Sequence, residues 1–281
     1  AKARVLLVLP AGAVDAGPIL HHGWRVGRRV VRLAVAVASV EEVLVDNRLQ
    51  HLRVHRRRRR QPPKVDAAEA EVWRGTWFGK QAVRKQRRPR SWRHADLDHR
   101  LGVRRMTSEA RLLIRLRKLG LPVPAVWDLD LEGGQLVLQW LPGRTLIEIL
   151  NDDDSDEHHV EAVLKSVGSA VRMLHREAIT HGDLSSNNML IDDGNVALID
   201  FGLAAVEYEV ERFGIDLHVL DEILGASQPQ WSQAIDWVLE GYAAVDVRLG
   251  LAPVLQGGTV PSAQEVLTRL DDIRQRVRYH G

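Results

Sequence analysis

Two aspartates and an asparagine lie within the short segment HGDLSSNNMLIDDGNVALIDFG, residues 181–202. Asp183 and Asn188 are five positions apart, and Asp200 follows after two short apolar runs. Carboxylate and carboxamide oxygens are ligands that Mg²⁺ takes in proteins, and a further carboxylate can orient an attacking hydroxyl or water. The segment therefore predicts phosphoryl transfer from ATP, with Asp183 as the orienting base and with Asn188 and Asp200 as ligands of Mg²⁺.

The surrounding residues predict the elements that bring these three side chains together. Apolar residues recur at helical spacing through residues 160–174, which predicts a helix that leads into a polar loop. Residues 189–191 and 196–199 predict two strands of a hairpin, which returns the chain beside that loop. Asp200 follows the second strand and can therefore share a metal ion with Asn188. The combination predicts an α+β, two-lobed protein-kinase-like fold, with a small β-rich N-lobe, a helical C-lobe and a short activation segment.

ATP also needs a cation for its phosphates, and Lys85 is the candidate. Residues 71–85 predict two strands joined by a turn over residues 74–79, with Lys85 at the end of the second strand. Its predicted partner is Glu109, on a helix that has an apolar stripe and ends at Gly120. Taken alone, both residues could be solvated surface groups. The catalytic segment downstream favours the ion pair.

Four segments resemble the PRPK-like family, the small atypical Ser/Thr kinases of the KEOPS complex. They are VRKQRRPRSWRHADLD (residues 83–98), SEARLLIRLRKLGLPVP (108–124), the pair HGDLSSNNMLI and LIDFGLA, and GIDLHVLDEIL (214–224). The resemblance covers residues 64–281 and implies ATP and Mg²⁺ as cofactors. It also implies autophosphorylation or ATP hydrolysis that supports threonylcarbamoyl-adenosine modification of tRNA. The implied partners are the threonylcarbamoyl-transferase subunit and a small subunit that docks on the N-lobe of a KEOPS-like complex.

The nucleotide-binding residues are the part of the site that departs from this family. The expected phosphate-covering loop consists of Ala67, Ala68, Glu69 and Ala70. Similar proteins carry Gly-Ala-Glu-Ala there, and alanine disfavours the positive-φ conformations that glycine allows. The adenine is expected at a hinge that includes Gln139 and Leu141.

Two other functions stay open. A small-molecule phosphotransferase of the antibiotic-kinase type would share the HGD motif and a nearby Asn, although the arginine-rich segment argues against it. A catalytically weak pseudokinase adaptor is favoured by the glycine-free loop and opposed by the complete set of polar site residues. Asp216 also has two interpretations, since it can hydrogen-bond backbone amides under the catalytic loop or act as a charge near a helix N-terminus.

Basic residues predict contacts with tRNA. Arginines surround Lys85 in residues 84–93, together with Trp92, and could bind RNA phosphates and stack on a base. A solvated charged loop would have the same composition. Residues 1–120 hold 29 of the 39 Lys and Arg but 10 of the 37 Asp and Glu. Near the C-terminus, Arg274, Arg276 and Arg278 precede Tyr279, a spacing that resembles the basic tails of archaeal members of the family and implies a second contact with RNA.

Composition divides the chain into three predicted parts. Residues 1–60 form a basic extension outside the fold, since arginine runs are typical of disordered segments. Residues 61–141 form the N-lobe, and residues 142–281 form the C-lobe with a basic C-terminal tail. The chain has no Cys and no apolar run long enough to span a bilayer, so we expect neither disulfides nor a membrane span, and a cytoplasmic location.

Overall fold

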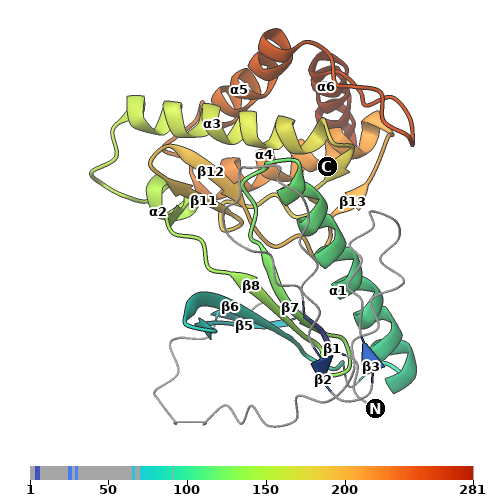
Figure 1. The fold of residues 1–281 in the computed structure, drawn as a ribbon. Coiled ribbons are helices and arrows are strands. Elements are labelled where there is room, and N and C mark those ends of the chain that lie inside the picture. Colours follow the sequence, from blue (N-terminus) through green and yellow to red (C-terminus); the bar gives the residue numbers. More distant parts are fainter. Residues whose placement is uncertain are drawn as a thin grey trace, which may run out of the picture.

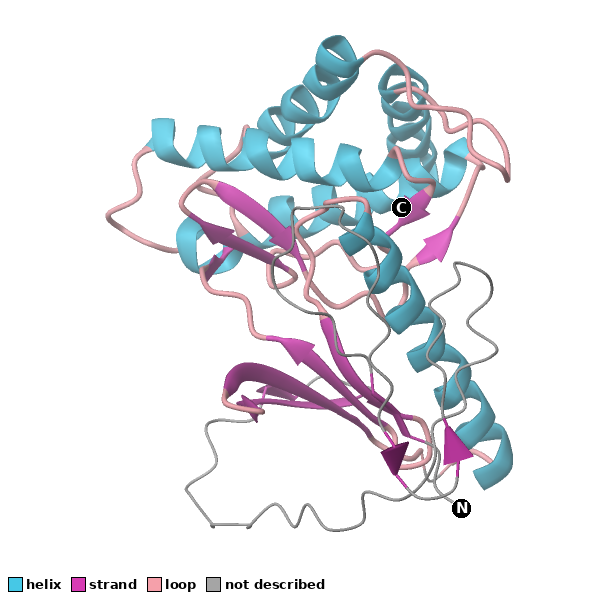
Figure 2. Ribbon diagram, in the orientation of Figure 1, coloured by secondary structure: helices cyan, strands magenta, loops and turns pink. Residues whose placement is uncertain are grey.

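The described residues form two lobes (Figure 1). The computed structural model describes residues 70–90 and 92–280, with side chains as far as residue 277, and the backbone of four short strands before residue 70. A sheet and one long helix form the N-lobe, while the C-lobe is mostly helical (Figure 2). Most of residues 1–60 lies outside the described part, so the domain boundaries stay a prediction. None of the described helices combines the length and the hydropathy needed to cross a bilayer.

An antiparallel sheet of six strands, in the order β1-β7-β8-β6-β5-β4, forms the N-lobe. A separate two-stranded pairing joins β2 and β3. The strands of this part are β1 (Arg4–Leu6), β2 (Arg25–Val26), β3 (Arg29–Val30), β4 (Val65–Asp66), β5 (Ala70–Trp77), β6 (Lys80–Arg87), β7 (Val126–Asp130) and β8 (Gln135–Gln139). Strand β6 lies between β5 and β8, so a side chain on its inner face is held from both sides.

The turn between β5 and β6 is shorter than the sequence predicts. Phe78 and Gly79 form it alone, with φ of 45° and 79°, which is the two-residue geometry whose twist suits antiparallel strands. Gly75, which suggested an earlier turn, lies inside β5 and pairs with β6. The prediction of a turn over residues 74–79 is therefore wrong. Lys85 lies two residues before the end of β6 rather than at its end.

Helix α1 (Ala95–Lys118) runs from the N-lobe sheet toward the C-lobe (Figure 1) and carries Glu109. The apolar stripe that predicted this helix lies in its second half, at Leu112, Leu113 and Leu116. Its first half packs on a charged side chain, because a Cβ atom on Gly102 would lie 2.3 Å from Nε of Arg87. A helix that packs on a guanidinium lacks the apolar period by which helices are recognised.

The C-lobe contains the predicted helix and hairpin. Its helices are α2 (Leu146–Leu150), α3 (Glu157–His175), α4 (Val210–Ser227), α5 (Ala234–Leu249) and α6 (Ala263–His280). Its strands are β9 (Arg144–Thr145), β10 (Ile179–Thr180), β11 (Met189–Asp192), β12 (Asn195–Leu198) and β13 (Ala205–Val206). The six apolar residues that predicted helix α3 are each at most 3% exposed. Strands β11 and β12 form the predicted hairpin, and β9 pairs with β11.

Helices α3 and α5 approach closely because each carries a glycine at the contact. A Cβ atom on Gly168 of α3 would lie 1.9 Å from the carbonyl oxygen of Val238. A Cβ atom on Gly241 of α5 would lie 2.0 Å from the carbonyl oxygen of Lys165. Backbone atoms cannot move aside as a flexible side chain can, so only glycine permits this helix separation.

Helix α6 carries two of the arginines that the sequence placed in a basic tail. Nε of Arg274 lies 2.7 Å from Oδ2 of Asp221, and Nη2 of Arg276 lies 2.9 Å from Oε1 of Glu211. Both acidic residues belong to α4. These two arginines therefore fasten α6 to α4.

Candidate active site

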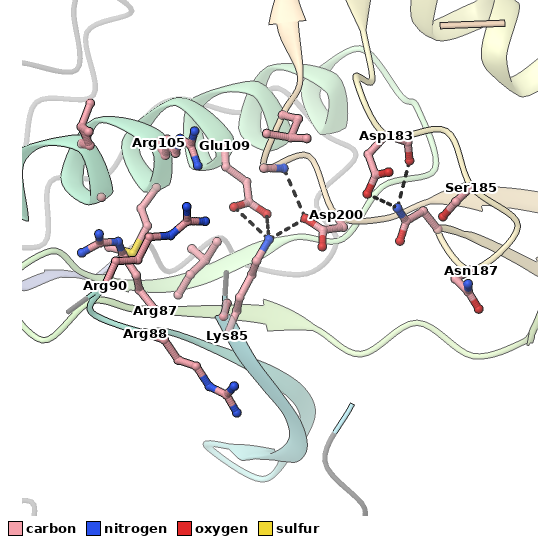
Figure 3. Close-up of a pocket in the computed structure, with 18 of the residues that line it drawn as sticks. Lys85, Arg87, Arg88, Arg90, Arg105, Glu109, Asp183, Ser185, Asn187 and Asp200 are labelled. Atoms are coloured by element: carbon pink, nitrogen blue, oxygen red, sulfur yellow. Dashed lines mark hydrogen bonds and ion pairs between the residues drawn. The ribbon is translucent and has the colours of Figure 1, made fainter. Parts of the chain in front are cut away.

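Three charged side chains from distant parts of the chain meet between the lobes (Figure 3). Nζ of Lys85, on β6, lies 2.9 Å from Oε1 of Glu109, on α1. The same nitrogen lies 2.6 Å from Oδ1 of Asp200, which follows β12. The predicted pair of Lys85 and Glu109 is present, and Asp200 joins it as a second carboxylate.

Burial and charge act against each other in this cluster. Burial lowers the pKa of Lys85, but the carboxylates of Glu109 and Asp200 outweigh it, so the pKa lies above its usual range. Burial raises the pKa of Glu109, which is 4% exposed, and the lysine opposes that rise. Burial also raises the pKa of Asp200, yet Lys85 brings it below its ordinary value. The lysine is thus firmly cationic and Asp200 firmly anionic.

The catalytic loop orients its own polar side chains. Nδ2 of Asn188 donates to the backbone oxygen of Asp183 at 2.9 Å and to its Oδ2 at 3.0 Å. With the amide nitrogen used in this way, the carbonyl oxygen of Asn188 remains as a potential metal ligand. Asp200 has a φ of 62°, in the left-handed region that few non-glycine residues adopt. Such a conformation marks a position whose side-chain direction is set by its surroundings.

Asp216 lies under the catalytic loop. Its contacts distinguish the two interpretations that the sequence left open. Its Oδ2 accepts from the backbone N–H of His181 at 2.6 Å, and its Oδ1 accepts from that of Gly182 at 2.8 Å. Asp216 is 3% exposed and belongs to the interior of α4, not to its first turn. The interpretation as an anchor of the loop backbone is therefore confirmed.

A buried network continues from Asp216 into the C-lobe. Nε2 of His175 lies 3.1 Å from Oδ2 of Asp216, and Nδ1 of His175 lies 2.8 Å from the hydroxyl of Tyr242. Burial lowers the pKa of His175, so the ring is neutral at pH 7. A neutral ring that donates to Asp216 from Nε2 accepts from Tyr242 at Nδ1. Arg172 and Asp246 complete the network through bonds of 2.9 and 2.7 Å between α3 and α5.

A cleft of about 480 Å³ opens beside the charged cluster. It is lined by Ala70, Leu136, Met106 and other residues of both lobes, and by five arginines. The arginines are Arg87, Arg88, Arg90, Arg93 and Arg105. Four of them belong to the basic segment for which the sequence predicted RNA contacts, and these four line the same cleft as Lys85.

Most predicted site residues line this cleft, and some do not. Those that line it are Lys85, Glu109, Asp183, Asn188, Asp200 and Ala70. Ala67, Ala68 and Glu69 lie outside the described residues. Gln139 and Leu141, expected beside the adenine, are not among the residues that line this cleft. The backbone N–H of Gln139 donates to the carbonyl of Ala125 at 2.8 Å.

Three further polar side chains line the cleft and were not among the predicted site residues: Arg105, Ser185 and Asn187. Ser185 and Asn187 belong to the catalytic loop, so their position in the motif was a sufficient signal. Arg105 precedes Glu109 by one helical turn and lies on the same face of α1. The sequence pattern does not indicate it, because Arg105 precedes the apolar stripe of the helix.

The chain is similar in sequence to known proteins. Residues 75–212 match the family model of the RIO domain. A probable serine/threonine-protein kinase BUD32 homolog of Archaeoglobus fulgidus is 33% identical over 197 residues, which cover 70% of this chain and 88% of that protein. The EKC/KEOPS complex subunit BUD32 of Gibberella zeae is 31% identical over 212 residues, or 69% of this chain and 76% of that protein. The chain belongs to the Bud32 family.

Bud32 and PRPK denote the same family, so the resemblance predicted from the four segments is confirmed, as is the two-lobed kinase-like fold. A longer Bud32 relative is the probable bifunctional tRNA threonylcarbamoyladenosine biosynthesis protein of Methanothermobacter thermautotrophicus. It is 32% identical over 187 residues, which cover 66% of this chain but 34% of that protein. This Bud32 chain therefore corresponds to about a third of the bifunctional protein.

Proposed function

We propose that this Bud32-family protein is an Mg²⁺-dependent Ser/Thr kinase or ATPase that supports threonylcarbamoyl-adenosine modification of tRNA within a KEOPS-like complex. The observation that carries this proposal is the convergence of Lys85, Glu109 and Asp200 beside the loop that holds Asp183 and Asn188. The names of the fungal and archaeal relatives support the complex and the tRNA pathway.

The side chains present fit ATP and Mg²⁺. The ion pair with Glu109 would hold the ammonium of Lys85 toward the α- and β-phosphates. Mg²⁺ is usually bound by one or two protein groups together with substrate phosphates. The carboxylate of Asp200 and the free carbonyl oxygen of Asn188 supply such a pair. The bound ion would neutralise charge on the phosphates.

Asp183 is the proposed group that orients the attacking hydroxyl or water. Its side chain is exposed to the cleft, and one oxygen is fixed by the amide of Asn188, which leaves the other for the attacking group. The backbone on its N-terminal side is fixed by Asp216. A base held in this way contributes through orientation, because little covalent chemistry is asked of the protein in phosphoryl transfer.

The remaining assignments follow the family. We place the adenine near Gln139 and Leu141 and the phosphate-covering loop at Ala67, Ala68, Glu69 and Ala70. The partners are the threonylcarbamoyl-transferase subunit, a small subunit on the N-lobe sheet, and tRNA, and the location is the cytoplasm. Relatives named as subunits of the EKC/KEOPS complex support such an assembly.

The test is Mg²⁺-dependent ATP turnover by the full chain, with and without tRNA and the transferase subunit. Asp183→Ala and Asp200→Ala should each reduce turnover by at least about a hundredfold, since each removes a group that acts in the transition state. Asp192→Asn, an exposed carboxylate of the hairpin that does not line the cleft, is the matched control. Equal and negligible turnover in all proteins under every condition would instead indicate the adaptor.

A further inference from the structure

The lining of the cleft has more basic than acidic side chains. Six of its lining side chains are Lys or Arg, and three are Asp or Glu. Lys85 already pairs with two of those three carboxylates, Glu109 and Asp200. In Figure 3, Arg87, Arg90 and Arg105 lie on the side of Lys85 that faces away from Asp183. Arg87 pairs with Asp98 and Arg88 with Glu71, and neither carboxylate lines the cleft. Each guanidinium has five N–H donors, so arginines that already have a partner can still donate to an anion at this end of the cleft.

The segment that carries these arginines is fixed by Asp98 of α1, which is 4% exposed. An oxygen of Asp98 lies 2.6 Å from Nη2 of Arg87, and the other accepts from the backbone N–H of Arg90 at 3.2 Å. The backbone N–H of Arg93 donates to the carbonyl of Arg90 at 3.1 Å. Because Gly102 has no side chain, the guanidinium of Arg87 can pack directly against helix α1. The loop is thus organised before any ligand arrives.

Trp92 lies in this loop and is 71% exposed, although tryptophan is usually well buried. The guanidinium of Arg93 lies 4.4 Å from the ring centroid and that of Arg90 lies 5.7 Å from it. Both arginines also line the cleft. An exposed aromatic ring beside two arginines that line a basic cleft has the features of a platform on which a nucleobase stacks while its phosphate contacts arginine.

We propose that Trp92 and the arginine end of the cleft bind one unpaired nucleotide of an RNA strand. The base stacks on Trp92, and the phosphate lies among Arg90, Arg93 and Arg105. Double-stranded RNA is a poor fit, because its bases are already stacked on one another. Since the arginines lie away from Asp183, this nucleotide is an effector of the ATP site and not its phosphoryl acceptor. The choice of RNA as the ligand rests on the proposed function.

The experiment measures binding of fluorescently labelled RNA to the full chain without ATP. The probes are a short single-stranded RNA and a duplex of the same sequence. The single strand should bind at least about tenfold more tightly, and Trp92→Ala should remove about tenfold of that affinity because one stacked base is lost. Trp92→Phe, which keeps an aromatic face, should retain affinity within about threefold.

Phe78→Ala is the matched control, because Phe78 is also 71% exposed but packs edge to face on Trp77, away from the arginines. Equal binding of single strand and duplex, or equal loss in Phe78→Ala and Trp92→Ala, would overturn the proposal. Inorganic tripolyphosphate serves as competitor. If it displaces the RNA completely and Trp92→Ala has no effect, the cleft binds anions without a base. Because the assay contains no ATP, its outcome is independent of the turnover test.

Discussion

Lys85 lies between the carboxylates of Glu109 and Asp200 in the lining of the cleft. In Lys85→Met, Glu109 is buried without its partner, and burial with the nearby charge of Asp200 favours the protonated carboxyl. We expect turnover to be lost and the free energy of unfolding at pH 8 to fall by about 3 kcal/mol. A raised pKa stabilises the folded state below that pKa, so the deficit should shrink at pH 5.

Chemical denaturation at the two pH values measures this difference. Lys80→Met, an exposed lysine at the start of the same strand, is the control. An equal loss of stability at pH 8 and pH 5 would show that Glu109 does not take up a proton when Lys85 is removed.

The buried histidines predict a second dependence on pH. Burial lowers the pKa values of His175 and His181 below the unfolded value of about 6.5. The unfolded chain then binds more protons below that pH. The free energy of unfolding should therefore be retained above about pH 6.5 and fall as the pH decreases, by up to about 1.4 kcal/mol per pH unit for each ring.

Urea denaturation between pH 7.5 and 5.5 tests this expectation. His175→Gln should be less stable at pH 7.5 but should lose less on acidification, since one of the two titrating rings is absent. His158→Gln, exposed on the first turn of α3, is the control. Parallel pH profiles of wild type and His175→Gln would contradict the assignment of a neutral His175.

At the scale of elements, hydrophobic periodicity predicted the elements that pack through apolar side chains. It did not predict the part of a helix that packs against a charged side chain. Helix α3 and the hairpin β11–β12 were predicted because every repeat of their patterns faces the core. The first half of α1 was not predicted, because Gly102 packs against Arg87 and an apolar pattern does not mark this contact. The pairing of Lys85 with Glu109 could be predicted from motifs, whereas the arginine end of the cleft depends on where α1 begins.

The crossing of α3 and α5 gives a prediction about helices. Gly241→Ala should lower the free energy of unfolding by about 3 kcal/mol or more, because the new methyl meets the backbone of Lys165. Gly225→Ala in α4 is the matched control. Nothing lies within 4 Å of its Cβ position, so the higher helix propensity of alanine should stabilise the protein by about 0.5–1 kcal/mol. Equal effects of both substitutions in urea denaturation would contradict the close approach.

At the scale of the whole molecule, the charge is divided along the chain. Residues 1–120 contain 29 of the 39 basic residues, whereas the remainder contains 27 of the 37 acidic ones, the other 10 lying in the first part. We expect tRNA affinity to fall at least about tenfold between 50 and 200 mM salt, because each neutralised phosphate releases counterions. Filter binding at several salt concentrations measures the slope. Affinity that does not change with salt would contradict binding through the basic part of the chain.

The anchoring of the catalytic loop by Asp216 has a consequence for the order in which the site is assembled during synthesis. Lys85 and Glu109 are 24 positions apart and can pair while the C-lobe is still being made. Asp200, the second partner of Lys85, is 115 positions further along the chain. The backbone amides of His181 and Gly182 cannot be bound until Asp216, 35 positions after His181, has been synthesised. Domains generally form as units when enough chain has emerged from the ribosome. A nascent chain released before helix α4 would carry every motif residue of the ATP site and still lack the support that orients its base.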